Sequence, residues 1–582
     1  MAAQAQPPSL PAAVRSAADS ISHAQLASTI TVTHETMLHM GSLLRAQVVI
    51  GFALLVGAGV RAQPPTLPAA VRNAAESISP EQLAWDLAFL ASDELRGRNT
   101  PSPGFDAAAD YIARRLADAG VKPAGDAGTF RQHYELRETR LATEAASIHI
   151  AGRDFDFGRD FVMRSLAAPI TGELAVVYVG HGWVIADRKI DPYAGVDVRG
   201  KLVLAHGAPP KGEEVRQIGR VSVGAETPLA AAAARGAAGV LFIAQANELV
   251  RWDAIRNGNT VRRELQPAVP SAYAAAPLTS VLLAPPVTRA LLEGEALGAD
   301  AALRAAESGD FPASFHLAKK LTVQLPLSAT TVYRPYNVVA LLEGSDPALK
   351  NQAITVFAHL DGAVGTRTVN GDAIYNSADD NASGSAALLS IAEQLAKAPR
   401  PKRTIIVVWD SGEEQGLWGT RWFVHSPPVP LSQIVAHFNV DMIGASRRPG
   451  SPDASETRVA ERNEVFLIGP QTLSRQAAVL LDRVNAEYLT LRFNRAYDTP
   501  DSEFFYPRTD AGPFLERGIL TIGFTTGIHS RYHLPADEAS ALDPRQMHAI
   551  ARTVLASVWM LADAAERPRI DQPMPRTVPK HQ

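Results

Sequence analysis

Five short segments in the C-terminal half of the chain carry histidine and carboxylate side chains at or just beyond the ends of apolar runs. In order along the chain they contain His359 and Asp361, Asp379 and Asp380, Glu413 and Glu414, Asp441, and His533. Imidazole and carboxylate groups are ligands that zinc and related divalent ions accept in proteins. The chain has no cysteine, which excludes disulfides, thiolate ligands and a cysteine nucleophile. Any bound metal would therefore be held by histidine and carboxylate.

Two of these segments contain adjacent carboxylates. Asp379 and Asp380 precede an expected helix, and Glu413 and Glu414 follow an apolar run that ends at Asp410. Adjacent carboxylates repel each other unless a cation or a helix dipole compensates them. A capping loop or a solvated charged loop would explain either pair alone. Because neighbouring residues in an extended chain project in different directions, one glutamate could bind a metal while the other faces a bound water.

The remaining candidates also sit where a strand is expected to end. Asp441 closes the apolar run IVAHFNVDM, and a buried carboxylate without a cation or a donor is costly. His359 and Asp361 close another run, and strand alternation would place both side chains on one side. Asp361 is then expected to hold the imidazole in one orientation. His533 lies in a loop restricted by Pro535 and supplies a second imidazole.

The elements that would position these residues alternate between strand and helix after residue 335. Apolar runs predict strands at 353–359, 403–410, 434–442 and 519–527, and helical patterns occur at 384–397, after 416 and at 544–564. This alternation predicts an α/β fold with a mostly parallel mixed sheet flanked by helices. Sites in such folds lie beyond the carboxyl ends of the strands, so we expect the five segments to converge on one edge of the sheet.

Taken in order, five motifs resemble those of the M28 family of zinc peptidases over about residues 336–564. They are His-x-Asp, Ala-Asp-Asp-Asn-Ala-Ser-Gly, Glu-Glu-x-Gly-Leu, Asp-Met-Ile-Gly and Tyr-His-x-Pro-x-Asp. The resemblance implies two Zn²⁺ ions per chain, with Co²⁺ or Mn²⁺ as substitutes. It implies that Asp380 bridges the ions, that His359 and Asp441 complete one site, and that Glu414 and His533 complete the other.

The resemblance also implies an activity. The expected enzyme is an aminopeptidase, a hydrolase that releases N-terminal residues from peptides with a free N-terminus by attack of a metal-bridging hydroxide. Glu413 would be the general base, with Asp361 as a second catalytic-site carboxylate. Family members tend to carry a cis peptide bond after the bridging aspartate, here between Asp380 and Asn381.

The preceding part of the chain reads differently. Two amphipathic helices are expected between 80 and 120, and short strands with an alanine-rich helix at 228–235 follow between 167 and 312. The order DVRGKLVLA, a small-residue helix, then RGAAGVLFI resembles a β-rich protease-associated (PA) domain, which is common in the M28 family. The expected divisions are 1–62 upstream segment and signal peptide, 63–166 helical part of the peptidase domain, 167–312 PA domain, 313–566 catalytic domain and 567–582 tail.

Two departures from the family pattern and two alternative functions remain. Many members have a second histidine where this chain has Gly362, and a histidine where it has Ala511, so we expect an altered rim of the substrate pocket. A glutaminyl cyclase-like acyltransferase on the same fold would use Glu413 for intramolecular acyl transfer. A catalytically inert receptor or binding homologue would lack ligands, whereas all the ligand positions are present here.

The first 62 residues and the overall charge bear on location and partners. Arg45 precedes an apolar run at 48–60 with small residues at its end, which is the layout of a secretory signal. We therefore expect export to a periplasmic or extracellular location with no stable membrane anchor after cleavage. Ala5–Ala27 nearly repeats Ala62–Ala84, which suggests a misassigned start or a duplicated reading frame. A net charge of -4 argues against nucleic acid as a partner, and the oligomeric state stays open.

Overall fold

The computed structural model describes residues 67–575 apart from short gaps at 214–216, 219–220, 223, 270–277, 366, 448–455, 457, 501 and 503–507. The predicted signal and the repeated segment upstream of it therefore lie outside the described residues. Within the described ranges, no helix is both long enough and apolar enough to cross a membrane.

The larger sheet is mixed, as the sequence predicted. Its central strands pair in parallel, antiparallel pairs lie on both sides of them, and one further parallel pair lies at one edge. Its strands lie in the order β1-β16-β18-β17-β19-β22-β20-β21, with β2 also paired to β16. The bounds are β1 (Lys122–Pro123), β2 (Arg131–His133), β16 (Tyr336–Leu342), β17 (Ala353–His359), β18 (Thr404–Asp410), β19 (Ile434–Val440), β20 (Glu464–Ile468), β21 (Arg492–Asn494) and β22 (Leu520–Thr525). β17 pairs in parallel with both β18 and β19, and β19 pairs in parallel with β22.

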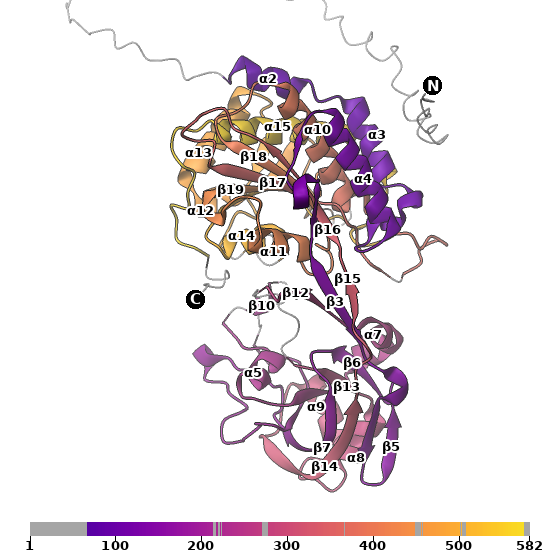
Figure 1. Ribbon diagram of the computed structural model, residues 1–582. Coiled ribbons are helices and arrows are strands. Elements are labelled where there is room, and N and C mark those ends of the chain that lie inside the picture. The colour runs from indigo at the N-terminus through magenta and orange to yellow at the C-terminus, as the bar shows by residue number, and fades with distance from the viewer. Residues whose placement is uncertain are drawn as a thin grey trace, which may run out of the picture. The chain divides into compact units, whose positions relative to one another are not determined.

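Helices cover both faces of this sheet because its central strands are apolar on both sides. The helices are α2 (Ala69–Glu76), α3 (Pro80–Leu90), α4 (Pro103–Asp118), α10 (Gly384–Lys397), α11 (Trp418–His425), α13 (Arg475–Glu487), α14 (Ala511–Leu515) and α15 (Pro544–Ala562) (Figure 1). Alternate residues of β17 serve the two cores: Ile354 and Val356 pack with α10 and α15, while Phe357 packs with Phe423 and Phe514 on the other face.

The two N-terminal helices that the sequence predicted are present and capped. Ser79 accepts a hydrogen bond from the backbone of Gln82 at the start of α3, and Ser102 accepts one from Phe105 at the start of α4. Both helices have proline in their first turn, where a missing N–H costs nothing. Phe105 and Ile112 of α4 are buried in the larger core.

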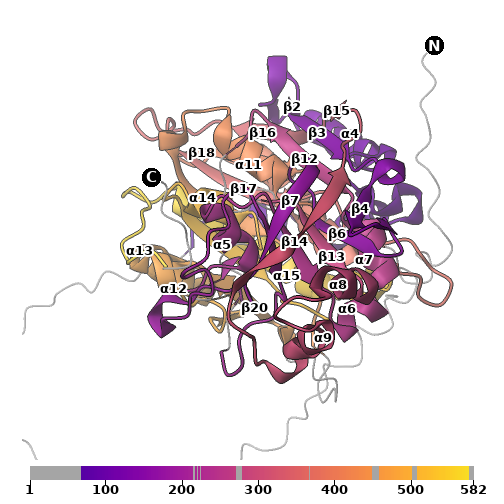
Figure 2. The ribbon, with the colours of Figure 1, turned by 90° about the horizontal axis from the view of Figure 1, so that it is seen from below.

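A second sheet is built from the middle of the chain. Its order is β5-β4-β14-β7-β8-β11-β13-β6. Its strands are β4 (Ser147–Ile150), β5 (Arg153–Asp156), β6 (Phe161–Ser165), β7 (Ile170–Tyr178), β8 (Leu202–Ala205), β11 (Gly239–Ile243), β13 (Ser280–Leu283) and β14 (Phe315–Leu325), with α5 (Pro228–Ala234), α8 (Pro285–Leu292) and α9 (Ala299–Ser308) among them. Figure 2 shows the long strands β7 and β14 side by side, as their pairing requires.

This sheet extends beyond the predicted bounds of 167 and 312 on both sides. β4, β5 and β6 precede residue 167, and β14 follows residue 312. The preceding strands are short and partly polar. β14 alternates between buried and exposed residues and lies inside the sheet, between β4 and β7. After β14 the chain next contributes a strand to the larger sheet at β16.

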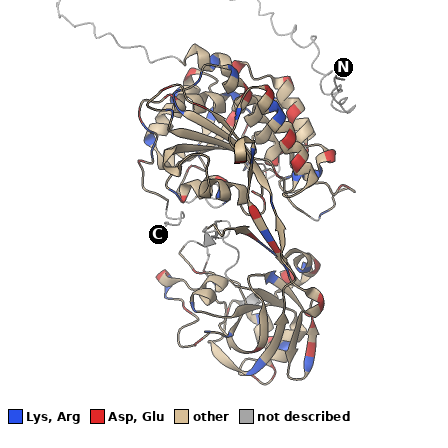
Figure 3. Cartoon of the chain, in the orientation of Figure 1, with Lys and Arg blue, Asp and Glu red and all other residues tan. Residues whose placement is uncertain are grey.

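A narrow three-stranded sheet lies between the larger sheet and the second sheet along the chain. β3 (Glu135–Arg140) carries the chain out of the larger sheet and β15 (Thr331–Tyr333) carries it back, and β12 (Val261–Gln266) pairs with β3 on the other side. β3 and β15 pair with each other, Leu136 opposite Tyr333. β3 carries both acidic and basic residues (Figure 3). Some of its side chains stay exposed although strands pair with it on both sides.

Candidate metal centre

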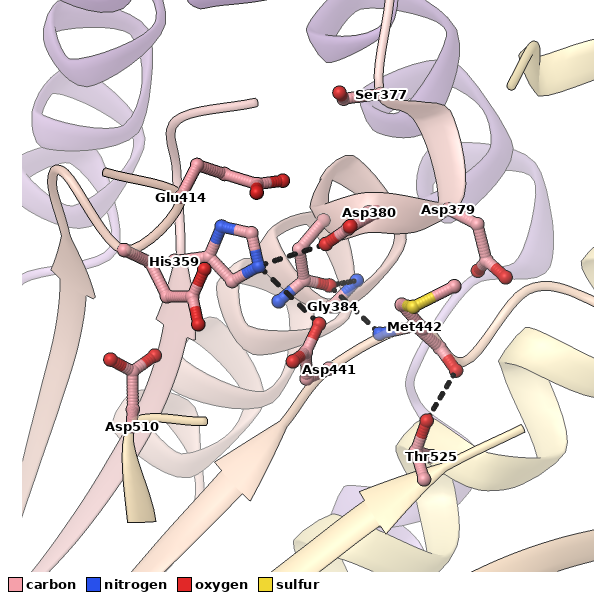
Figure 4. Close-up of polar contacts among 12 residues, drawn as sticks. His359, Ser377, Asp379, Asp380, Gly384, Glu414, Asp441, Met442, Asp510 and Thr525 are labelled. Carbon is pink, nitrogen blue, oxygen red and sulfur yellow. Dashed lines mark hydrogen bonds and ion pairs between the residues drawn. The ribbon is translucent and has the colours of Figure 1, made fainter. Parts of the chain in front are cut away.

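Three parallel strands of the larger sheet bring the predicted segments to one edge. His359 is the last residue of β17, Asp441 follows β19 directly, and Glu413 and Glu414 lie in the loop after β18. The carboxyl ends of parallel strands share an edge, which is why segments distant in sequence meet here. In Figure 4, His359, Asp380, Glu414 and Asp441 surround one region, whereas the side chain of Asp379 points away from it.

The first group of side chains contains His359, Asp380 and Asp441. His359 Nε2 lies 3.1 Å from Asp380 Oδ1 and 3.4 Å from Asp441 Oδ1. The imidazole is 1% exposed, so these contacts are largely shielded from solvent.

The second group contains Asp380, Glu414 and His533. His533 Nε2 lies 3.1 Å from the other oxygen of Asp380, Oδ2, and 3.0 Å from Glu414 Oε2. Asp380 thus presents one carboxylate oxygen to each imidazole. His533 is more exposed than His359, and the ring of Tyr532 stacks on it with centroids 3.7 Å apart.

These groups fit divalent metal ions. Atoms about 2.0–2.2 Å from a tetrahedral zinc ion are about 3.3–3.6 Å from one another, close to the distances given above. Among the described residues, His359 Nε2, Asp441 Oδ1 and Glu414 Oε1 are buried without a partner of good hydrogen-bonding geometry. Buried polar atoms that converge without partners indicate a missing cation. Nitrogen and oxygen donors without sulfur suit zinc, cobalt and manganese.

The electrostatics of the site point the same way. Burial lowers the pKa of His359, but Asp441 and Asp380 outweigh burial and raise that pKa well above its ordinary value. Burial likewise lowers the pKa of His533, yet hydrogen bonds to Asp380 and Glu414 raise it to about 10. Burial and the neighbouring Asp380 raise the pKa of Glu414 to about 7. The cluster therefore favours added positive charge, whether a proton or a metal ion.

Hydrogen bonds to other segments fix the loop that carries Asp380. The loop, η5 (Ala378–Ser383), contains the expected cis peptide bond between Asp380 and Asn381. Asp537 Oδ2 accepts hydrogen bonds from the N–H groups of Asp379 and Asp380, both at 3.1 Å. Asn381 Nδ2 donates to the carbonyl of Val440 at 2.9 Å, which ties the loop to the end of β19.

Asp361 occupies a different position from the one expected. His359 Nδ1 lies 3.0 Å from the main-chain carbonyl of Asp361, whereas the carboxylate Oδ1 is 4.0 Å away. β17 ends at His359, so strand alternation does not continue to Asp361. The carboxylate instead accepts a hydrogen bond from the backbone N–H of Glu413 at 3.2 Å, which connects it to the glutamate loop.

A cavity opens beside the site. Asp380, Glu413 and Asp441 line its polar side, together with Arg508 and Tyr532. Its apolar lining consists of Met442, Ile468, Phe524 and Ile528. Burial raises the pKa of Glu413 well above its ordinary value, and Asp510 is among the carboxylates that raise it further. The cavity therefore combines an acidic wall with an apolar pocket.

The two departures from the family pattern lie in different places. Ala511 lines this cavity, in accord with the expected change at its rim. Gly362 is buried: a Cβ atom there would lie 2.6 Å from the carbonyl oxygen of Gly97 and from Ser377. The expectation of a rim position is therefore wrong for Gly362, because another loop packs against it.

Sequence reasoning missed two buried polar groups behind the ligands. His529 Nε2 lies 3.2 Å from Asp379 Oδ2 and 3.7 Å from Asp537 Oδ1. The only sequence signal was the aspartate at the end of the Tyr-His-x-Pro-x-Asp motif.

The second missed group is the acid pair Asp410 and Asp510, which Thr420 bridges. Thr420 Oγ1 lies 3.0 Å from Asp410 Oδ2 and also contacts Asp510. A hydroxyl donates one proton, so one of the two buried carboxyl groups must keep its own. Burial raises the pKa of both, that of Asp510 to about 6.

The fold and the site together define a class. An α/β sheet whose strand ends bear two imidazole–carboxylate groups sharing one aspartate is the arrangement of a metallohydrolase. The model of Peptidase family M28 matches residues 337–558, the part of the chain that holds every candidate ligand. Residues 337–558 are therefore similar to a peptidase family M28 domain, in agreement with the resemblance that the five sequence motifs carry.

Individual relatives agree with this assignment. An aminopeptidase of Pseudomonas aeruginosa (strain UCBPP-PA14) is 31% identical over 194 residues, which are 33% of this chain and 31% of the relative. A probable zinc metalloprotease of Leptosphaeria maculans is 27% identical over 267 residues, 40% of this chain and 58% of the relative. The chain thus spans about a third of the length of the Pseudomonas protein.

The solved structure of an aminopeptidase from Aneurinibacillus sp. strain AM-1 is similar in fold. It aligns with 88% of this chain and 99% of its own, with a TM-score of 0.51 and 17% sequence identity.

Proposed function

We propose that this protein is a two-zinc aminopeptidase that removes single residues from the free N-termini of peptides. The observation that carries the proposal is the position of Asp380, whose two oxygens each lie 3.1 Å from a different imidazole. One ion would be held by His359, Asp380 and Asp441, and the other by Asp380, Glu414 and His533.

Zinc at these positions would lower the pKa of a bound water towards neutrality and polarise the scissile carbonyl group. Glu413 lines the cavity beside the ligands and is proposed as the general base. It would take the proton from the attacking water and pass it to the leaving amine. The hydrogen bond from its N–H to Asp361 fixes the backbone that carries it.

The shape and charge of the cavity support attack at the first peptide bond. The carboxyl groups of Asp441 and Glu413 on its polar side would face a free α-amine, and its apolar lining would contact the side chain of the first residue. Two of the relatives' names, aminopeptidase and zinc metalloprotease, agree with this chemistry.

Zinc analysis and a defined set of peptides test this proposal. A free peptide should lose residues one at a time from its N-terminus, and its N-acetylated twin should stay intact. Two zinc ions per chain should accompany the activity. Internal cleavage of the acetylated peptide would contradict the aminopeptidase assignment, and ammonia release from an N-terminal glutamine peptide without free amino acid would favour the cyclase alternative.

We also propose export, which rests on the signal-like sequence at 37–62 alone. Intact-mass analysis of the extracytoplasmic protein should give a chain beginning near Gln63. Recovery there of a chain still carrying residues 1–62 would contradict export by signal cleavage.

A further inference from the structure

One buried arginine contacts the metal centre's backbone from behind. The Arg98 side chain is completely buried, and its guanidinium donates hydrogen bonds to four main-chain carbonyl groups. Nε donates to Leu360 O at 2.8 Å, Nη1 to Asn376 O at 2.9 Å and to Leu90 O, and Nη2 to Ser377 O at 3.0 Å.

Three of these carbonyl groups belong to two of the segments that carry ligands of the first group, and the fourth, that of Leu90, ends α3. Leu360 lies between His359 and Asp361, and Ser377 precedes η5, which contains Asp380. One side chain therefore fixes the end of β17 relative to the loop of the shared aspartate.

The third ligand-bearing loop contacts the same stretch of chain, Leu95–Thr100, which we call the Arg98 turn. Thr100 Oγ1 accepts a hydrogen bond from the N–H of Gly412 at 3.1 Å. The carbonyl of Thr100 accepts one from Gln415 Nε2 at 2.7 Å. Gly412 and Gln415 flank Glu413 and Glu414, so the Arg98 turn contacts three of the five ligand-bearing segments.

The turn also fits closely between these loops. Arg96, Gly97 and Arg98 all have positive φ, at 47°, 77° and 55°. A Cβ atom at Gly97 would overlap the carbonyl of Tyr375, and a Cβ atom at Gly362 would lie 2.6 Å from Gly97 O. Side chains are therefore excluded on both sides of the contact, which explains why this chain has glycine at 362.

We infer that Arg98 is a positioning residue of the metal centre. Its guanidinium sets the spacing of the His359 and Asp380 segments through main-chain carbonyls, and Thr100 of the same turn contacts the glutamate loop. The inference rests on the proposed two-zinc function. Only arginine offers five N–H donors in a rigid plane, so lysine cannot replace these contacts. Burial lowers the pKa of Arg98 to about 10, with Asp361 and Asp537 acting against burial, so the group stays charged at neutral pH.

The chain contains a matched control. Arg403 is also completely buried and also donates to main-chain carbonyl groups, those of Ala562, Ala564 and Glu566. It immediately precedes β18, at the opposite end of that strand from the glutamate loop. Loss of Arg403 contacts should affect folding stability without touching the ligand loops.

The experiment compares Arg98→Lys with Arg403→Lys in the full chain. Zinc affinity is measured by competition with a chelator of known affinity, thermal unfolding on the zinc-free protein, and kcat and KM on a peptide substrate. We expect Arg98→Lys to weaken zinc binding roughly 10- to 100-fold, the range seen when groups that orient metal ligands are removed. Its kcat should fall with KM little changed. Arg403→Lys should lower the melting temperature but keep wild-type zinc affinity.

Equal zinc affinity in Arg98→Lys and wild type, or equal losses in the two lysine variants, would overturn the positioning role. If Arg98→Lys does not fold, Thr100→Val removes only the hydrogen bond to Gly412 and should still weaken zinc binding; wild-type affinity in that variant overturns the inference. A wild-type chain that binds no zinc would overturn the proposed function and this inference together. Zinc binding by wild type with full retention in the variants overturns the inference alone.

Discussion

Glu413 and Glu414 are neighbours with the same side chain, yet they have different surroundings. Glu414 Oε2 lies 3.0 Å from His533 Nε2, within the second group of candidate ligands. Glu413 lines the substrate cavity, and its N–H is fixed by Asp361. The two residues are therefore a natural pair of variants with identical chemistry and separate roles.

Glu414→Gln should lower both zinc content and activity, because a neutral amide is a weaker ligand than a carboxylate. Glu413→Gln should keep about two zinc ions and near-normal KM while kcat falls roughly 10²- to 10⁴-fold, the usual contribution of a general base. Elemental analysis and steady-state kinetics distinguish the two. The roles are reversed if Glu413→Gln loses the metal while Glu414→Gln retains it.

A second residue-scale prediction concerns acid stability. His206 follows β8, is completely buried, and contacts the hydroxyl of Tyr178 at 3.0 Å. Burial, with a smaller effect of His181, lowers its pKa to about 4. The unfolded chain binds this proton below about pH 6.5, but the folded protein binds it only near pH 4. The stability present above pH 6.5 is therefore lost as the pH falls.

Between pH 7 and pH 5 the wild type should lose about 2 kcal/mol more stability than His206→Gln, whose amide still accepts from Tyr178. Denaturant unfolding of the zinc-free protein at both pH values provides the comparison. An equal loss in both proteins would show that His206 is not responsible.

At the scale of elements, the site depends on how closely the start of α10 approaches the end of β19. Gly384 is the first residue of α10, and Figure 4 shows it beside Asp441. A Cβ atom at Gly384 would overlap the carbonyl of Val440 and the side chain of Asn381. Separation of these elements would also separate Asp380 from Asp441.

Gly384→Ala should therefore destabilise the protein by about 1–3 kcal/mol, as overpacking usually does, and should reduce zinc affinity. The control is Gly258→Ala, another helical glycine, at the exposed end of α7 (Trp252–Gly258), where a Cβ atom meets nothing within 4 Å. It should leave zinc affinity unchanged. Thermal unfolding and zinc competition test both variants, and normal zinc affinity in Gly384→Ala would contradict the close-approach argument.

The elements that the sequence predicted well were those with local signals. β17 and β19 are continuous apolar runs, and α10 has the predicted bounds of 384 and 397. Their carboxyl ends gave the candidate ligands by the general rule for parallel sheets. Arg98 could not be found in this way, because its four partners are backbone carbonyls scattered from residue 90 to residue 377. The contact between Asp361 and the imidazole of His359 was misjudged because β17 ends two residues earlier, and the main-chain carbonyl of Asp361 lies closer to the ring than its carboxylate.

At the scale of the whole molecule, the inserted segment 137–332 contacts the glutamate loop without supplying a candidate ligand from its described residues. Arg263 Nη1 donates to Gln415 Oε1 at 2.9 Å, and Leu265 packs near Trp418. We propose that this segment, which includes residues 167–312 expected to form a PA domain, shapes access to the cavity and selects for peptide length.

Excision tests this proposal, since β3 and β15 pair at Leu136 and Tyr333. These positions can be joined by an Asn-Gly turn. The shortened chain should keep two zinc ions while its preference for peptide length changes. The point variant Arg263→Ala, which removes the contact to Gln415 together with the ion pair to Glu138, is the control for the loop. A folded excision variant without zinc would show that the segment supplies a ligand.

The pairing of β3 with β15 also has a kinetic consequence. Asn337 and Gln132 are hydrogen-bonded although 205 residues separate them, and the entropy lost in closing a loop rises with its length. Once the insert has folded and β3 has paired with β15, the chain that must still be ordered between Gln132 and Asn337 is only a few residues long. We expect β2 to join β16 only after that step. Pulse-labelling hydrogen exchange during refolding should therefore show protection of the amides of β7 and β14 before those of β2. Pairing of β2 with β16 in the larger sheet would then depend on prior folding of the insert, which supplies no candidate metal ligand from its described residues.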